Sequence, residues 1–230
     1  MAAFHPALQA ITDTHARDVL IHLHGKASRQ NISLAVRFAT QLPRLLRGRP
    51  LPWARLEPKL SEMYLALDPA NGVFCYLLAR AMQARRIVEF GTSFGVSTIY
   101  LALAVRDNGG GIVIGTEMVP EKAAQARTNL RDAGLDAFVD IREGNALETL
   151  RDIDGPVDFL LNDGFPHFTL PVLKLLAPHM RAGAAALCGN AAAFPADHAD
   201  YLAWVRDPAN GFQSMKLAMK LAGEFSIKAV

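Results

Sequence analysis

Short apolar segments alternate with helical segments from position 86 onward, and this alternation constrains the fold more than any other feature of the chain. Strands are predicted at 86–90, 112–116, 138–142, 157–162 and 184–188, and helices at 96–106, 120–133 and 170–180. Such alternation is typical of a parallel sheet with both faces covered by helices.

The two ends of the chain have a different pattern. The first fifty-odd residues and the segments 73–83 and 198–205 are predicted to be helical. The segments 214–220 and 224–229, joined at Ala222-Gly223, favour a hairpin that adds antiparallel strands at the sheet edge. We expect residues 1–65 to form a helical lid or dimerisation segment, and residues 66–230 to form the sheet domain.

Charge and composition exclude several classes of protein. The 24 basic and 22 acidic residues give a net charge of only +2, which argues against a dedicated nucleic-acid binder. No apolar run approaches the length of a membrane span. Cys75 and Cys188 lie far apart in apolar contexts, which suits reduced thiols. We therefore expect a cytoplasmic protein that binds neither nucleic acid nor membrane.

A glycine-bearing turn follows the first predicted strand. In an open parallel sheet, ligands bind beyond the carboxyl ends of the strands, so Gly91 and Gly95 mark a candidate site. Their Gly-x3-Gly spacing differs from the dinucleotide fingerprint, and a plain strand-helix turn is the alternative. Glu117 ends the next strand, where a carboxylate can accept the two hydroxyls of a ribose. The pair indicates a nucleoside ligand without a pyrophosphate, such as S-adenosylmethionine.

These segments resemble the class I methyltransferases, more closely the small-molecule O-methyltransferases of the catechol and caffeoyl-CoA type and their bacterial relatives. The resemblance covers about Asp68 to Val230 and is carried by the segments 87–97, 143–146, 157–164 and 181–190 and by Glu117. It implies a Rossmann-like α/β fold with a mostly parallel seven-stranded sheet, S-adenosylmethionine as cofactor, and methylation of a small-molecule hydroxyl. We also expect a homodimer, because apolar helices that extend beyond a sheet domain often bury themselves against a partner.

The resemblance also implies site residues. Glu89 and Gly91 would shape the methionine pocket, and Ser97 would meet the methionine carboxylate. Glu117 would hold the ribose, while Asn145 and Ala146 would line the adenine. Asp163 would lie beside the sulfonium. The predicted cofactor-binding residues are Glu89, Gly91, Ser93, Gly95, Ser97, Glu117, Asn145, Ala146 and Asp163.

One metal position and the lysine position depart from the cation-dependent relatives. Asp163 and Asn190 stand at two of the three metal positions, but Gly189 stands at the middle one and Pro166 replaces the lysine base. Magnesium prefers near-octahedral oxygen ligation. We therefore predict a weakened or absent metal site, with no metal ligand assigned, and a reaction independent of magnesium.

Without metal or lysine, a different proton acceptor is needed, unless positioning alone suffices. His167, four residues after Asp163, is the candidate base, and these two are the predicted catalytic residues. His22 and His24 are the alternatives. The acceptor itself is not identified; Phe94, Phe165, Phe168 and Trp204 would line an apolar pocket or belong to the core.

Two other functions stay open at this point. A homologue that binds the cofactor but is catalytically inert, acting as a partner or regulatory subunit, would show the same losses. Gly91-Thr-Ser-Phe-Gly95 also matches the nucleophile elbow of serine hydrolases, with Asp163 and His198 in the required chain order. The arginines between Arg44 and Arg55 form a solvated face or meet an acidic ligand.

Overall fold

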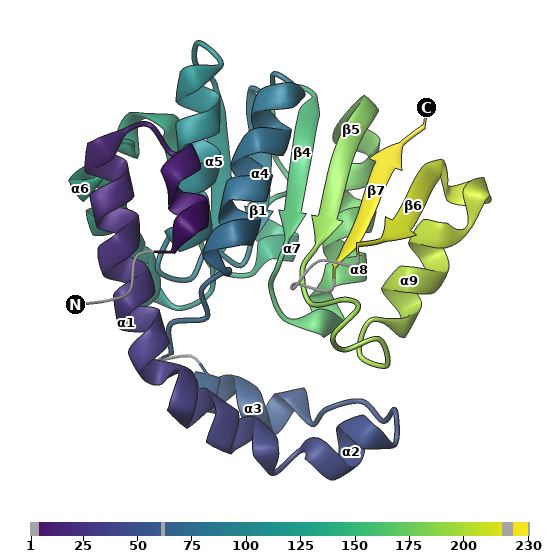
Figure 1. Cartoon of the computed structure of the whole chain (residues 1–230). Coiled ribbons are helices and arrows are strands. Elements are labelled where there is room, and N and C mark those ends of the chain that lie inside the picture. Colours follow the sequence, from purple (N-terminus) through teal and green to yellow (C-terminus); the bar gives the residue numbers. More distant parts are fainter. Residues whose placement is uncertain (1–4, 61–62, 218–222, 230) are drawn as a thin grey trace.

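The computed structural model describes residues 5–60, 63–217 and 223–229, and the side chains of these residues apart from 31–38. Its centre is a sheet of seven described strands in the order β3-β2-β1-β4-β5-β7-β6 (Figure 1). The strands are β1 (Arg86–Phe90), β2 (Ile112–Glu117), β3 (Val139–Glu143), β4 (Val157–Asn162), β5 (Met180–Cys188), β6 (Phe212–Lys216) and β7 (Glu224–Lys228). The first five are parallel, and β7 is antiparallel to β5 and β6. The predicted fold class is confirmed.

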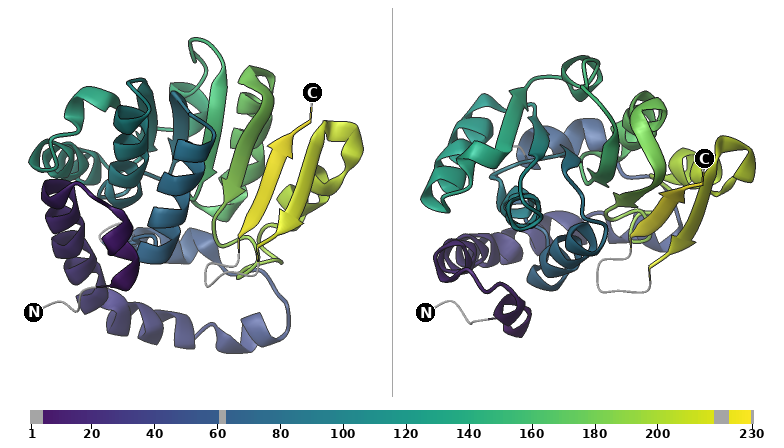
Figure 2. Two further views of the ribbon diagram at one scale, coloured as in Figure 1. Left: turned by 45° about the horizontal axis from the view of Figure 1, so that its top comes forward. Right: turned by 90° about the horizontal axis from the view of Figure 1, so that it is seen from above.

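Helices cover both faces of this sheet (Figure 2). The described α-helices are α1 (Thr14–Ala39), α2 (Leu42–Leu46), α3 (Trp53–Leu60), α4 (Pro69–Ala81), α5 (Val96–Asp107), α6 (Pro120–Asp132), α7 (Ala146–Thr149), α8 (Pro166–Leu176) and α9 (Ala199–Arg206). Short 3-10 helices lie at Pro6–Ala10, Asp136–Phe138, Ala177–His179 and Pro208–Asn210. None of the described helices is both long and apolar enough to cross a membrane.

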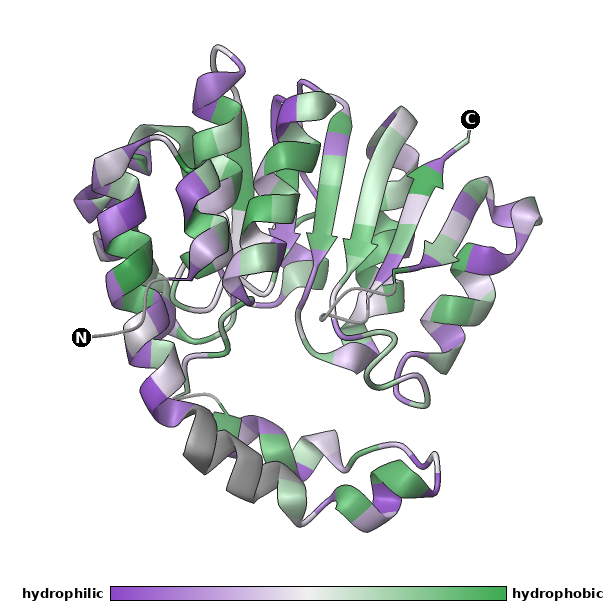
Figure 3. Ribbon diagram, viewed as in Figure 1, coloured by the Kyte–Doolittle hydropathy of each residue, from purple (hydrophilic) through white to green (hydrophobic). Residues whose placement is uncertain are grey.

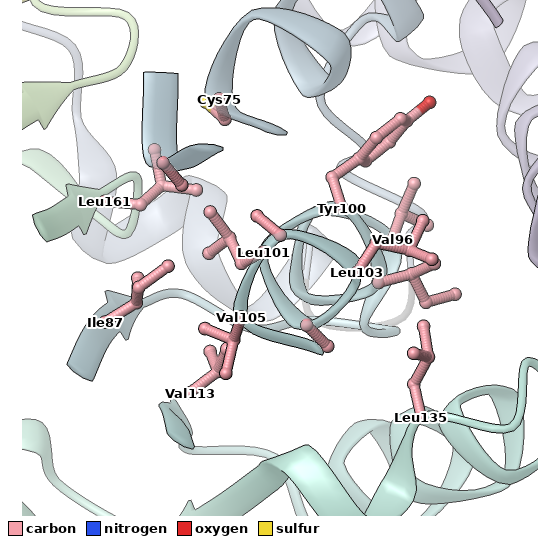
Figure 4. Close-up of a cluster of buried hydrophobic side chains, with 14 of the residues drawn as sticks. Cys75, Ile87, Val96, Tyr100, Leu101, Leu103, Val105, Val113, Leu135 and Leu161 are labelled. Carbon is pink, nitrogen blue, oxygen red and sulfur yellow. The ribbon is translucent and has the colours of Figure 1, made fainter. Parts of the chain in front are cut away.

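Strand alternation divides the interior into two cores. Neighbouring side chains of a strand point to opposite faces, so Ile87 contributes to the core shared with α1, α4, α5 and α6, while Val88 contributes to the core shared with α8 and α9. Apolar residues therefore run through both the strands and the helix faces that cover them (Figure 3). In the first core, Leu101 and Val105 of α5 lie on the side of the helix that faces Ile87 and Val113, while Leu103 lies on the side toward Leu135 (Figure 4).

Two predicted boundaries shift in the second half of the chain. The predicted helix 170–180 is observed at Pro166–Leu176. It begins earlier because proline is favoured in a first helical turn. β5 begins at Met180, four residues earlier than predicted, and its pairing with β4 changes register between Val157 and Phe159. The predicted strand 214–220 is observed at 212–216, and its positions 218–220 and Ala222 lie outside the described residues.

The segment predicted as an N-terminal lid or dimer arm has two structural parts. Leu8, Ile11, Leu20 and Leu23 are buried in the main core, so the start of α1 belongs to the body of the domain. Beyond it, α2 and α3 cross below the carboxyl ends of β4 and β5 (Figure 1). There the buried residues Leu51, Leu56, Leu60 and Met63 form a separate small core, against which Trp53, Phe165 and Phe194 pack. We call residues 42–60 the cap.

Candidate active site

A cleft of about 610 Å³ lies between the carboxyl edge of the sheet and the cap. One end is lined by residues that follow β1, β2 and β3, namely Gly91, Ser93, Glu117, Met118, Val119, Gly144, Asn145 and Ala146. The other end is lined by residues of the cap, of the β4–α8 turn and of the β5–α9 loop, namely Trp53, Glu57, Pro58, Phe165, Pro166, Phe168, Asn190, Phe194 and His198. Asp163 and Gly164 also line it.

The turn after β1 is fastened to the acid that ends β2. Gly91 has φ +98°, and a side chain at this position would press on the backbone of Asp163 and Gly164. Ser93 also has a positive φ of +51°, and its backbone N–H donates to Glu117 Oε2 over 2.7 Å. The second carboxylate oxygen, Oε1, accepts from Val119 N at 2.8 Å. Glu117 is thereby fixed in the wall of the cleft, as a ribose-binding acid requires.

Two of the predicted cofactor residues, Glu89 and Gly95, lie behind this wall. Glu89 is fully buried, and its Oε2 accepts hydrogen bonds from Thr92 at 2.9 Å and Thr98 at 2.5 Å. Burial raises the pKa of Glu89, although hydroxyl donors oppose the change. Gly95 starts α5, where an added Cβ would lie 3.1 Å from Ala126 Cβ, so its smallness serves helix packing. Neither residue lines the cleft.

The remaining predicted cofactor residues lie at or near the first end of the cleft. Ser97, at the start of α5, lines a small adjoining pocket together with Ser93. Asn145 caps α7 by accepting from Leu147 N at 3.0 Å, and Ala146 follows it in the cleft wall. The binding roles of these residues stay predictions. Apart from Glu89, every predicted cofactor residue outside the turn 91–95 lines the cleft or the small pocket beside it, namely Ser97, Glu117, Asn145, Ala146 and Asp163.

The cap, together with Tyr64 just beyond it, is attached to this end of the cleft by aromatic and cationic side chains. The ring of Tyr64 stacks on Phe94 with centroids 3.8 Å apart. Lys122 of α6 lies 5.3 Å from the same Phe94 ring, and its Nζ donates to Leu60 O at 3.4 Å. Burial lowers the pKa of Lys122, while Glu117 opposes this shift. Phe94 therefore joins the cap to the glycine turn instead of lining the cleft.

Asp163 occupies the middle of the cleft and is unusually basic for an aspartate. Burial, with a contribution from the charge of Glu89, raises its pKa to about 7. Its Oδ1 accepts from Asn190 Nδ2 at 3.1 Å. A Cβ at Gly189 would overlap this carboxylate, so Asp163 fills the space in which a side chain at 189 would begin.

These residues do not fit a magnesium ion. One carboxylate is present, and the neighbouring amide donates its N–H to that carboxylate. Magnesium requires oxygen ligands in near-octahedral geometry. Within the described residues, no group of three or more His, Cys, Asp and Glu side chains is arranged to hold a metal.

The predicted base and its alternatives lie outside the cleft lining. His167 Nδ1 is 3.3 Å from Glu57 Oε1, its side chain is 47% exposed, and its ring packs on Phe168 with centroids 4.3 Å apart. His24 of α1 is half-buried against α5, where its Nε2 is 2.9 Å from the hydroxyl of Tyr100, and desolvation lowers its pKa to about 4. Neither these two nor His22 is among the cleft residues.

The sequence predicts a lid within residues 1–65 but does not identify the residues of the cap that form the second wall of the site. Trp53 packs against Phe165 and Phe194 with ring centroids 6.0 Å apart in both pairs. Asp197 fixes this arrangement, because its Oδ1 accepts from Leu51 N at 2.7 Å and from Trp53 Nε1 at 2.8 Å. Of the four aromatic residues considered from the sequence, Phe165 and Phe168 line the cleft. Trp204 packs on Phe212 instead.

Sheet order and site together define the class of protein. Five parallel strands with reversal between β1 and β4, an antiparallel pair at one edge, and an acid fixed at the end of β2 make up the class I methyltransferase fold. Residues 88–191 match the family model Methyltransf_24, described as a methyltransferase domain.

Curated relatives and solved structures agree with this class. A catechol O-methyltransferase of Niastella koreensis is 39% identical over 103 residues, which are 43% of this chain and 46% of that protein. A catechol O-methyltransferase of Mycobacterium tuberculosis is 35% identical over 127 residues, 55% of this chain and 57% of that protein. The chain thus spans about half the length of the curated relatives it matches.

Among solved structures, cofactor-bound Rv0187 from MTB superposes with a TM-score of 0.67 at 26% identity, covering 74% of this chain and 85% of that one. The Bacillus cereus O-methyltransferase in complex with SAH has a TM-score of 0.66 at 22% identity, covering 77% and 88%. The resemblance to class I O-methyltransferases of the bacterial catechol and caffeoyl-CoA type is confirmed.

Proposed function

We propose that this chain is an S-adenosylmethionine-dependent O-methyltransferase that methylates a small-molecule hydroxyl without magnesium. The observation that carries this proposal is the continuous cleft, which joins the fixed carboxylate of Glu117 at one end to an aromatic chamber at the other, with Asp163 between them. The relatives named catechol O-methyltransferase and the cofactor-bound structural neighbours support the same activity.

The residues of the first end suit the cofactor. Glu117 presents carboxylate oxygens to a ribose diol, with both already oriented by backbone N–H groups. The hydroxyl of Ser93 is buried without a hydrogen-bond partner among the described residues, so it is available to the polar end of the methionine. Asn145 and Ala146 line the position expected for the adenine. When bound, the cofactor supplies an activated methyl group on a sulfonium.

The second end suits a small acceptor held for in-line attack. Trp53, Phe165 and Phe194 give it apolar walls that exclude water, and Asp163 places a carboxyl group between the two ends. Orientation of a nucleophile at attack distance can supply much of the acceleration of such a displacement. Our proposal therefore assigns the cap a part in acceptor binding, in agreement with the lid role expected for residues 1–65; a homodimer and a cytoplasmic location stay predictions.

Two measurements test the proposal. Calorimetric titration with S-adenosylhomocysteine is expected to show one site per chain. In a panel of catechols, phenols and hydroxy acids, we expect at least one compound to accept a labelled methyl group. Rates should be the same with EDTA and with added magnesium. Tight product binding without transfer to any acceptor would instead support the inert-homologue alternative, and a magnesium requirement would contradict the metal-free part.

The comparisons favour neither alternative function. The matching family model is described as a methyltransferase domain, and the two curated relatives and the Bacillus cereus structure are named O-methyltransferases. The serine hydrolase alternative would in addition need Ser93 to react, and the absence of labelling by a fluorophosphonate would exclude it.

A further inference from the structure

His198 is a buried imidazole in the wall of the acceptor end, and the function proposed above leaves it without a role. It lies at the end of the β5–α9 loop, directly before α9, and is only 1% exposed. The loop folds back on itself at this point, because the backbone N–H of His198 donates to Phe194 O over 3.2 Å. His198 and Asn190, which contacts Asp163, line the same cleft.

One hydrogen bond fixes which ring nitrogen of His198 carries the proton. Nδ1 lies 3.0 Å from the carbonyl oxygen of Phe194. A carbonyl can only accept, so the neutral ring is protonated at Nδ1 and carries its free lone pair on Nε2. Nε2 is buried and has no hydrogen-bond partner among the described residues. A buried, unpaired nitrogen costs free energy, which a bound hydroxyl donor would relieve.

The surroundings of His198 keep the ring neutral at physiological pH. Burial lowers its pKa, while the Phe194 carbonyl and the carboxylates of Asp197 and Asp200 oppose this change. Asp197 is already engaged by Leu51 N and Trp53 Nε1. Across the cleft, Asp163 and Glu57 are the other charged groups near the acceptor end. A neutral imidazole with one free nitrogen is a proton acceptor.

We propose that His198 is the general base for the acceptor hydroxyl, an inference that rests on the proposed methyl transfer and deepens it. In this step the O–H bond of the acceptor breaks and its proton passes to Nε2, directly or through one water. The oxygen forms a bond to the methyl carbon as the carbon–sulfur bond breaks, and that electron pair stays on sulfur as a neutral thioether. The imidazolium then releases its proton to water, which restores the resting base.

The neighbouring histidine gives an internal comparison. His167 is closer in sequence to Asp163, but its ring faces Glu57 and is about half exposed. Pro166, at the position of the lysine base in the relatives that the chain resembles, has no side-chain nitrogen. His198 is far from Asp163 in sequence, and the folding of the β5–α9 loop places it in the cleft wall. It is the one histidine among the described residues that line the cleft.

The test uses the full chain and two substitutions of each histidine. His198→Asn keeps an amide N–H near the position of Nδ1 and removes Nε2, and His198→Gln places an amide near Nε2 but no base. His167→Asn and His167→Gln are the matched variants. Single-turnover methyl transfer is measured with a series of phenols of decreasing pKa, and binding of S-adenosylhomocysteine is measured by calorimetry.

Loss of a general base is expected to slow transfer to weakly acidic phenols by about 10²–10⁴-fold in both His198 variants. The defect should shrink for phenols that are already ionised at the assay pH, and the variants' rate should rise with pH until the phenol ionises. Affinity for S-adenosylhomocysteine should be unchanged. The same rate in His198→Asn as in the wild type, an equal defect for all phenols, or the acid-dependent defect in the His167 variants would overturn the proposal.

A second readout does not depend on activity. Nitrogen NMR of the wild-type imidazole is expected to show a neutral ring protonated at Nδ1 at pH 7, and the opposite tautomer or a charged ring would contradict the inference. The two proposals fail separately: a wild type that transfers methyl to no acceptor contradicts the proposed function, whereas an active wild type with an equally active His198→Asn contradicts only the role of His198.

Discussion

Strand β4 carries an aspartate near each end, and the two differ in what surrounds them. Asp158, near the amino end, accepts hydrogen bonds from Arg85 N, Arg86 N and Arg181 Nε. Burial alone would raise its pKa, but these donors lower it. Asp163, just past the carboxyl end, has one amide partner, Asn190, and a pKa raised to about 7.

This contrast separates groups that serve stability from groups kept available for a ligand. Near the amino edge of the sheet, the charge of Asp158 is neutralised within the protein. At the carboxyl edge, the buried atoms Ser93 Oγ and His198 Nε2 have no hydrogen-bond partner among the described residues. Unpaired buried polar groups are costly, so a ligand that formed hydrogen bonds with these two atoms would be favoured at this edge.

The largest expected effect is on the free energy of unfolding when Asp163 is replaced. Asp163→Asn removes a carboxylate whose ionised form the fold disfavours. The folded pKa of about 7 lies above the ordinary value of 3.8, so wild-type stability falls as pH rises between these values. The variant is therefore expected to gain stability above pH 7, by up to about 4 kcal/mol, and to gain nothing near pH 4. Urea denaturation at pH 4.5 and pH 8 measures the difference.

Asp158→Asn is the matched variant with the opposite sign. Its carboxylate has a lowered pKa, so it stabilises the fold above the ordinary pKa of an aspartate, and its loss should destabilise the protein at pH 8. If both variants shift stability in the same direction at pH 8, the contrast between the two ends of β4 is wrong.

A second prediction concerns the acid at the end of β2. Glu117→Ala removes the predicted ribose ligand and the acceptor for Ser93 N and Val119 N. We expect binding of S-adenosylhomocysteine to weaken at least about 100-fold, near 3 kcal/mol, because charge-assisted hydrogen bonds are lost. Calorimetry measures the affinity. Glu121→Ala, at an exposed position in the first turn of α6, is the control and should bind normally; equal losses in both variants would remove Glu117 from the site.

A third prediction concerns the attachment of the cap. Asp197→Ala leaves Leu51 N and Trp53 Nε1 without their acceptor, and an unpaired, partly buried donor costs about 1–2 kcal/mol. The KM for the acceptor is expected to rise while affinity for S-adenosylhomocysteine is unchanged. Steady-state kinetics measures the acceptor KM, and calorimetry measures the cofactor affinity. Asp207→Ala is the control, because Asp207 caps a 3-10 helix elsewhere in the molecule. A loss confined to cofactor affinity would contradict this assignment.

The smallest expected effect is at the aromatic wall. Trp53→Phe keeps an aromatic ring against Phe165 and Phe194 but loses the indole N–H that donates to Asp197. Acceptor KM should rise about 3- to 10-fold, corresponding to about 1 kcal/mol. Substrate saturation curves check this value. An unchanged KM would mean that the acceptor lies away from the cap.

The sequence was sufficient for the order and type of most elements of the sheet and for the glycine turn, since these depend on local pattern, whereas the cofactor roles of the residues at that turn stay predictions. The strands at 86–90 and 157–162 lie where the apolar pattern places them, because alternation and turn residues are short-range signals. Glu117 likewise follows from its place at a strand end. The residues from Gly91 to Ser97 are contiguous, so their grouping requires no knowledge of tertiary contacts.

The residues of the acceptor end could not be predicted from the local sequence pattern. Asp197 and Trp53 are 144 residues apart, and only the folded chain shows that one accepts from the other. His198 was considered only for the hydrolase alternative, because neither its tautomer nor its unpaired Nε2 is encoded in neighbouring residues. Proximity in sequence favoured His167, whose helical position turns its ring toward Glu57 instead.

The close approach at Gly189 also has a consequence for evolution. The cation-dependent relatives that the chain resembles have an acid at this position, where this chain has Gly189. A Cβ at 189 would nevertheless overlap the present carboxylate of Asp163. An acid at position 189 would thus require the Asp163 carboxylate to leave the place it now fills, together with its bond from Asn190. A single substitution at Gly189 would therefore not by itself complete a metal site, because it displaces the carboxylate that the site would also need.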